Sequence, residues 1–169
     1  MSETSPIDPV AATGFAAGAA TYVVGRPEYP AEVEDWLRQD LRLGPGRAVV
    51  DLGAGTGKFV ARLRATGATL FAVEPVPAMR RALVAANADV VAKPGTAERI
   101  PLPDASMDAI VCAQSFHWFA NRAALVEMRR VLKIGGALGL IWVSLRLRPP
   151  CREGGDRDAA QLDRPYERG

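Results

Sequence analysis

Short apolar runs alternate with helical stripes along most of this 169-residue chain, and this alternation constrains the fold more than any other feature. Runs with the length and character of buried strands occupy residues 48–52, 69–73, 88–92, 107–112 and 137–143. Strands that alternate with helices usually run parallel and are joined by right-handed crossovers. The sequence therefore predicts an α/β fold, a doubly wound and mostly parallel sheet with helices on both faces.

The expected helices follow from apolar spacing and from capping residues. Pro30 suits the first turn of a helix that ends before Gly44-Pro45-Gly46. A helix that starts at Pro77 is expected to bury Met79, Leu83 and Val84 on one face. Asn121 is expected to cap a later helix that ends at Gly135-Gly136. The apolar face of this later helix is expected to consist of Leu125, Met128, Val131 and Leu132.

A glycine-rich turn connects the first strand to its helix, with the sequence Gly53-Ala54-Gly55-Thr56-Gly57-Lys58. Such a turn lets a ligand approach bare backbone N–H groups at the carboxyl end of the strand. A dinucleotide fingerprint needs glycine where Lys58 stands, and a phosphate-binding Walker loop needs other residues than Leu52 and Phe59. The spacing therefore disfavours both nucleotide classes, while a tight turn that binds nothing stays possible.

Two acidic residues accompany this turn. Glu74 ends the second strand about 20 residues further on, where a carboxylate can accept hydrogen bonds from both hydroxyls of a ribose. The alternative for Glu74 is a solvated strand end. Asp51 stands at the tip of the first strand, where its carboxylate either braces the amide groups of the loop or simply favours a turn.

These segments resemble the motifs of class I S-adenosylmethionine-dependent methyltransferases. The resemblance covers roughly residues 15–143 and keeps the motifs in the family's order. Ile134 replaces the proline that the family usually has before its glycine pair. The matching segments are Val50 to Gly57, Ala72 to Pro75 with Met79, Gly95 to Leu102, and Arg130 to Gly136.

A narrower resemblance is to the methyltransferase type 11 group, close to the trans-aconitate-type small-molecule methyltransferases. It is carried by Tyr22, by Arg26 to Pro30, and by Phe116-His117-Trp118-Phe119. The implied cofactor is S-adenosyl-L-methionine, and the implied partner is a small-molecule methyl acceptor, with a carboxylate or a hydroxyl as the expected nucleophile.

The resemblance also assigns roles on the cofactor side. The backbone of Gly53, Ala54 and Gly55, near Asp51, should face the methionine part of the cofactor, and Glu74 should hold the ribose. Pro75 and Met79 should shape the adenine pocket, Thr96 and Ala97 should meet the adenine edge, and Gln114 should lie near the methionine end. Many relatives carry an aspartate where this chain has Thr96.

The acceptor side is less determined by the sequence. His117, the only histidine, follows the fourth strand and is either a general base or a packed, hydrogen-bonded residue. Trp118 either lines an apolar pocket or covers the sheet edge. Arg26 either grips a carboxylate of the substrate or the cofactor with its planar fork, or is an exposed loop arginine. Tyr22 either closes over the cofactor or belongs to the core.

The resemblance ends abruptly at Val143. Residues 1–14 are expected to form a mobile arm, residues 15–143 an incomplete methyltransferase domain, and residues 144–169 a disordered tail. The family normally continues with further strands, so we expect the C-terminal strands to be missing through a frameshift or truncation. A cofactor-binding fragment with little or no activity is therefore an alternative function, and a nucleotide-dependent oxidoreductase is a remote one.

Composition adds mainly exclusions. The net charge of +2 does not favour nucleic acid or a membrane surface as a partner. We find neither a run of about 18 apolar residues nor a signal-peptide pattern, so a cytoplasmic location is expected. Cys112 and Cys151 show no metal-ligand spacing, and no metal is predicted.

Overall fold

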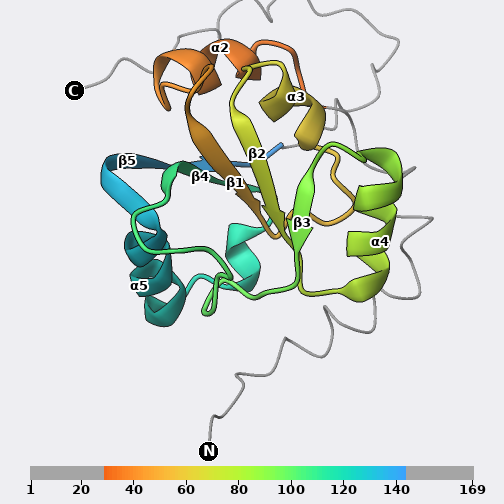
Figure 1. Cartoon of the computed structure of the whole chain (residues 1–169), viewed down its shortest axis with the longest axis vertical. Helices are drawn as coiled ribbons and strands as arrows, with labels where there is room; N and C mark the ends of the chain where they lie inside the picture. The colour runs from red at the N-terminus through yellow and green to blue at the C-terminus, as the bar shows by residue number, and fades with distance from the viewer. Residues whose placement is uncertain (1–28, 144–169) are drawn as a thin grey trace, which may run out of the picture.

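The computed structural model describes residues 29–143, and within them five strands form one parallel sheet (Figure 1). The strand order is β3-β2-β1-β4-β5, and each registered pair is parallel. The order reverses between β1 and β4, which makes their carboxyl ends the topological switch point where ligands bind in such sheets. The strands are β1 (Ala48–Leu52), β2 (Thr69–Val73), β3 (Val91–Lys93), β4 (Met107–Ala113) and β5 (Leu132–Ile141).

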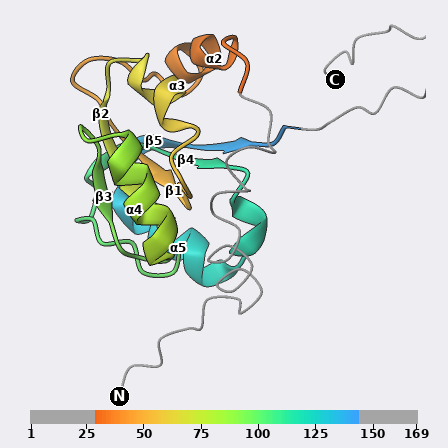
Figure 2. The ribbon, with the colours of Figure 1, turned by 90° about the vertical axis from the view of Figure 1, so that its right-hand side faces the viewer.

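Helices cover both faces of the sheet, which confirms the doubly wound α/β prediction. Val49 of β1 belongs to a core cluster with Leu37 and Leu63, whereas its neighbour Val50 belongs to a cluster with Met128 and Val131. Figure 2 shows α2 and α3 on one side of the sheet and α5 on the other. The helices are α2 (Val33–Gln39), α3 (Val60–Arg64), α4 (Pro77–Ala86) and α5 (Arg122–Val131), with the short 3-10 helix η1 (Phe116–Trp118) before α5.

The junction between α5 and β5 differs from the sequence prediction. The helix ends at Val131, and β5 begins at Leu132, where it pairs with Met107. The predicted helix end at Gly135-Gly136 is therefore wrong. These glycines lie inside the strand, where the register shifts and Gly135 has a φ of 76°. The glycine pair allows an irregularity in the strand and does not cap the helix.

Other differences concern the third strand and two helical faces. β3 lies at Val91–Lys93 rather than at 88–92. Val84 and Leu125, expected in the core, are 44% and 46% exposed. Each lies one position after a buried residue, Leu83 and Ala124, and one residue turns a helix by about 100°. The expected arm at 1–14 and tail at 144–169 lie outside the described residues.

Asp108 of β4 ties three strands together at the amino end of the sheet. Its Oδ2 accepts hydrogen bonds at 2.8 Å from the Ala48 N–H and from Lys133 Nζ. Arg47 approaches its other oxygen at 3.2 Å. Asp108 is buried, so the three donors compensate for the loss of water around its charge. This cluster lies at the end of the sheet opposite to the glycine loop.

We expect Asp108→Ala to lower the free energy of unfolding by about 1–3 kcal/mol, because the Ala48 N–H loses its acceptor. Chemical denaturation would measure the loss. Asp89→Ala is the matched control, since Asp89 also pairs with an arginine, Arg64, but at the surface. Equal losses in the two variants would contradict a role for Asp108 in joining the strands.

Candidate functional site

The glycine loop is held against the end of β2 by main-chain hydrogen bonds. The N–H groups of Gly53 and Ala54 both donate to the carbonyl oxygen of Val73, at 2.9 and 3.2 Å. Gly53, Gly55 and Gly57 have φ angles of 71°, 58° and 85°, in the left-handed region that favours glycine. The loop conformation therefore requires these glycines, and it brings main chain rather than side chains to the carboxyl edge.

Glu74 joins this loop to the turn that follows β2. One carboxylate oxygen accepts the Gly55 N–H and the other accepts the Val76 N–H, each at 2.8 Å. Glu74 is only 4% exposed, so it is not a solvated strand end. Burial raises the pKa of Glu74, while the hydrogen bonds from Val76 and Gly55 oppose that rise. Arg80 fixes the main chain of Glu74 by donating to its carbonyl oxygen at 2.8 Å.

Asp51 is a second buried carboxylate near the same edge. Neither of its oxygens has a hydrogen-bond partner within the part of the chain that the structure describes. Burial, followed by the negative charge of Glu74, raises the pKa of Asp51 to about 7. A buried carboxylate without a donor is costly, which makes Asp51 a site for a compensating positive charge or hydrogen-bond donor.

These features fit S-adenosylmethionine, which carries a sulfonium, an ammonium and two ribose hydroxyls. The two acidic groups suit its positive charge. From residues 29–143, each oxygen of Glu74 accepts one hydrogen bond, which leaves capacity for a hydroxyl. Among the described residues, 29–143, a Cβ placed on Gly55 would meet only Met79 Sδ, at 4.0 Å. With respect to this part of the chain, the loop thus has open space beside a polarizable apolar side chain, and the half-buried Pro75 follows Glu74 directly.

The segment after β4 packs directly against the glycine loop. Ser115 Oγ donates to the carbonyl oxygen of Leu52 at 2.7 Å. A Cβ on Gly53 would lie 2.8 Å from Ser115 Cβ and 3.2 Å from Phe119 Cε1. Gly53 therefore has no room for a side chain. The close contact fixes the segment that contains His117 and Trp118 beside the start of the loop.

His117 and Trp118 are both exposed, and their ring centroids lie 4.9 Å apart. His117 is thus accessible at this edge, and its role as a general base or as a packed residue stays a prediction. Tyr22 and Arg26 lie outside the described residues, so their predicted roles remain untested.

The remaining predicted cofactor residues lie on two other segments of this edge. Thr96 is half-buried and forms an isolated bridge with Arg99, whereas the side chain of Ala97 is in the core, so only its main chain can face a ligand. Gln114 has a φ of 57°, and its side-chain amide donates to the carbonyl oxygen of Val143 at 2.9 Å. This bond ties the end of β4 to the end of β5.

The sequence reasoning missed Ser115 and Arg80. A serine after a strand and an arginine in a helix carry no distinctive signal, because each is common at such positions. Their partners, Leu52 and Glu74, become visible only in the folded chain.

Comparison with known proteins identifies the family. Residues 50–140 match the model of the methyltransferase domain family. An uncharacterized methyltransferase of Mycobacterium tuberculosis is 47% identical over 128 residues, which cover 76% of this chain and 51% of that protein. A demethylmenaquinone methyltransferase of Deinococcus radiodurans is 39% identical over 102 residues, 56% of this chain and 42% of that protein.

A solved structure agrees in fold. The SAM-dependent methyltransferase of Aquifex aeolicus superposes with a TM-score of 0.56 at 22% identity, over 69% of this chain and 66% of that one. The chain thus belongs to the methyltransferase domain family and has the class I fold. It spans about half the length of the curated relatives it matches.

Two further observations bound the site. Across residues 29–143, each helix is too short or too polar to cross a membrane. Within the same range, no group of three or more His, Cys, Asp or Glu is placed to hold a metal ion.

The raised pKa of Asp51 predicts a specific pH dependence. Between its unfolded pKa of about 4 and its folded pKa of about 7, the folded state binds more protons, so this residue makes the protein less stable as the pH rises. The contribution of Asp51 should fall by at most about 1.4 kcal/mol per pH unit in that window and be constant above it.

Asp51→Asn should remove this contribution while keeping the shape of the side chain. As the pH rises from 4 to 7, we expect the free energy of unfolding of the wild type to fall relative to that of the variant. Urea denaturation at several pH values would measure it. A difference that is constant across the window would show that Asp51 is already ionised in the folded chain.

Proposed function

We propose that the chain transfers a methyl group from S-adenosylmethionine to an oxygen atom, a carboxylate or a hydroxyl, of a small molecule. The observation that carries the proposal is the contact of Ser115 and Phe119 with Gly53, because it brings the exposed His117 and Trp118 next to the loop expected to hold the cofactor. The cofactor supplies a methyl group on a positively charged sulfur, so the protein mainly has to align the acceptor oxygen with it.

On the cofactor side, the main chain of Gly53–Gly55 would face the methionine part. Glu74 would accept hydrogen bonds from the ribose, a role supported by its burial and by its bond to Gly55. Asp51 would balance the positive charge of the cofactor. Pro75 and Met79 would line the adenine. The position of Met79 Sδ, 4.0 Å from where a Cβ of Gly55 would lie, supports this.

Two segments would complete the cofactor site. The Thr96 side chain and the Ala97 main chain would meet the adenine edge. Gln114 would lie near the methionine end through its main chain and its amide oxygen, since its amide nitrogen is bound to Val143.

On the acceptor side, His117 would take the proton from a hydroxyl acceptor as the new C–O bond forms, whereas a carboxylate acceptor has no proton to lose. Trp118 would pack against the apolar part of the acceptor. Arg26 would pair with a carboxylate through its planar fork, and Tyr22 would close over the cofactor. A quinone-type acceptor is a second candidate, favoured by the 39% identity to a demethylmenaquinone methyltransferase.

We also propose that residues 15–143 form the domain, that its acceptor is a free small molecule rather than a nucleic acid, and that it works in the cytoplasm. The near-neutral charge supports the choice of acceptor.

Calorimetric titration with S-adenosylhomocysteine and with NAD tests the cofactor, and transfer of a labelled methyl group to panels of carboxylates, phenols and quinones tests the reaction. We expect binding of S-adenosylhomocysteine but not of NAD, and transfer to one acceptor class. NAD binding alone would contradict the proposal. Cofactor binding without transfer to any panel would favour the cofactor-binding fragment instead.

Glu74→Ala should weaken binding of S-adenosylhomocysteine by about 1–3 kcal/mol, because the ribose hydroxyls lose a charged acceptor. Glu74→Gln should weaken it less, since the amide oxygen can still accept a hydrogen bond. Glu32→Ala, at an exposed position, is the control. An unchanged affinity in a folded Glu74→Ala variant would place the ribose elsewhere.

His117→Ala should lower the rate of transfer to a hydroxyl acceptor by roughly 10²-fold, because the acceptor loses its general base. The affinity for S-adenosylhomocysteine should not change. Steady-state rates and the same titration provide the two readouts. If transfer is undiminished with a hydroxyl acceptor, His117 is not the base.

A further inference from the structure

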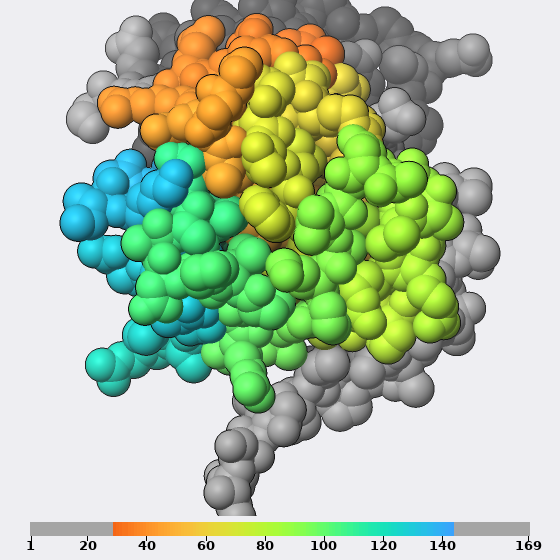
Figure 3. Space-filling model, viewed as in Figure 1, coloured from red at the N-terminus to blue at the C-terminus, as the bar shows by residue number. Residues whose placement is uncertain are grey.

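Helix α5 is bonded at three levels to the loop between β3 and β4, residues 94–106. Near its start, the Asn121 side-chain amide donates to Glu98 at 2.8 Å while its oxygen caps the helix. Further along, Glu127 accepts the N–H of Ile100 at 2.9 Å, and Arg130 donates to the carbonyl oxygen of Ile100 at 2.9 Å. Figure 3 shows this loop, in green, crossing the face of the molecule in the centre of the view.

Arg130 uses all five of its N–H groups in this connection. Two are donated to the carboxylate of Glu127, at 2.8 and 2.7 Å, and one to Ile100. The remaining two reach the carbonyl oxygen of Leu102 at 2.9 Å and Asp104 at 2.6 Å. A planar guanidinium can satisfy this set of acceptors, whereas the single ammonium group of a lysine has three donors in another geometry.

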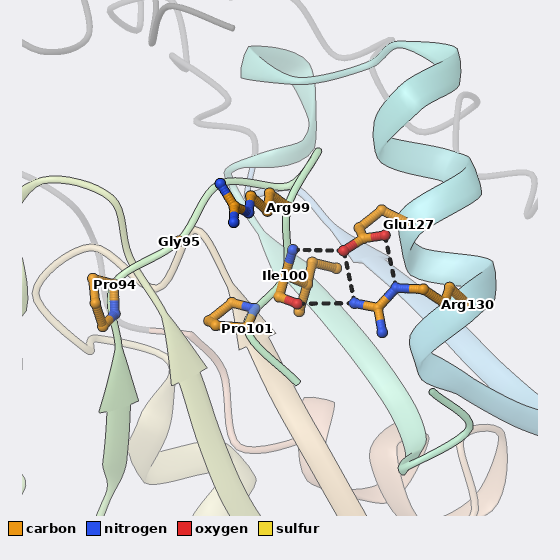
Figure 4. A pocket seen from close by; sticks show the side chains of 7 residues that line it. All are labelled: Pro94, Gly95, Arg99, Ile100, Pro101, Glu127 and Arg130. Carbon is orange, nitrogen blue, oxygen red and sulfur yellow. Dashed lines mark hydrogen bonds and ion pairs between the residues drawn. The ribbon is translucent and has the colours of Figure 1, made fainter. Parts of the chain in front are cut away.

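Glu127 completes the arrangement from the same helix. Its Oε1 receives both Arg130 and the Ile100 N–H, so the peptide groups on the two sides of Ile100 are fixed by one ion pair (Figure 4). The hydrogen bonds of Arg130 lower the pKa of Glu127, so the pair stays charged at neutral pH. Figure 4 shows Arg99 pointing away from this pair.

The clamped residues control where the edge of the loop lies. Ile100 is 2% exposed and shares a core cluster with Ala97. Arg99 N–H donates to the carbonyl oxygen of Thr96 at 3.2 Å, which closes a tight turn between them. A Cβ on Gly95 would lie 2.5 Å from Pro101, so the two ends of this turn touch. A shift of Ile100 would therefore move Thr96 and Ala97 with it.

We infer that Glu127 and Arg130 are positioning residues for the adenine end of the cofactor site, acting through the main chain of Ile100 and Leu102. The inference rests on the proposed function, which places the adenine edge against Thr96 and Ala97. Neither Glu127 nor Arg130 contacts the cofactor itself in this arrangement. Their effect is to hold the hydrogen-bonding groups of the loop where they distinguish adenine from another base.

The test compares two ligands that differ only at the base. S-adenosylhomocysteine carries the 6-amino group of adenine, and S-inosylhomocysteine carries an oxygen there, which reverses the hydrogen-bonding character. The dissociation constants of both are measured by calorimetry for the wild type, Arg130→Gln, Glu127→Gln and Arg129→Gln, well below each unfolding midpoint. Arg129 is the matched control, because it is an exposed arginine on the same helix.

We expect the wild type and Arg129→Gln to prefer adenine to the same degree. Arg130→Gln should bind S-adenosylhomocysteine about tenfold more weakly and lose most of the preference. Glu127→Gln, which keeps an acceptor for Ile100, should show a smaller loss in the same direction and provides the test if Arg130→Gln does not fold.

Three results would overturn the inference. An unchanged preference in Glu127→Gln and Arg130→Gln, even with a lower unfolding midpoint, would reduce the pair to a stabilising contact. A wild type that binds both ligands equally would remove the adenine edge from this loop. A wild type that binds neither ligand would contradict the proposed function itself, and the inference with it.

Discussion

The hydrogen bonds of Glu74 are the interaction on which this site depends. One carboxylate takes an N–H from the glycine loop and an N–H from the turn before α4, and so joins two connections that begin on neighbouring parallel strands. Arg80 holds the same residue by its main chain from one turn into α4. Without a buried acceptor at this position, the loop would still be held to Val73 by the main chain of Gly53 and Ala54, but it would lose its side-chain link to the turn after β2. The proposed cofactor site and the local fold therefore share one carboxylate.

Glu74 also determines the electrostatics of its surroundings. Its negative charge adds to burial in raising the pKa of Asp51 to about 7. Two buried carboxylates near one loop disfavour each other's ionised form, and a positively charged ligand relieves both. In the free protein, the buried carboxylates are consequently less well paired at this edge than at the opposite edge. There Asp108 has three basic or N–H partners. The better satisfied carboxylate thus lies at one end of the sheet and the proposed cofactor site at the other.

α5 connects the two proposed halves of the site. Its capping residue follows the segment of His117 and Trp118, and its far end clamps the loop of Thr96 and Ala97. The helix is short, but it packs on the sheet through Ala124, Met128 and Val131, which gives the clamp a rigid base. The same helix thus positions both the acceptor-side segment and the adenine-side segment.

The sequence by itself determined β1 and β2 to the residue, the glycine loop, the acidic residue after β2 and the family. These features are local, because side-chain periodicity and turn chemistry are set within a few residues. It misplaced the start of β5 and the exposure of Val84 and Leu125, where one residue or a strand irregularity changes the buried face.

Only the tertiary structure decided the pKa of Asp51, the hydrogen bond from Ser115 to Leu52, and the use of all five N–H groups of Arg130. Each depends on partners far away in the chain: Leu52 and Ser115 are 63 positions apart, and Arg130 and Leu102 are 28 apart. Burial and hydrogen bonding at such separations are properties of the packed molecule, so no local sequence pattern could predict them.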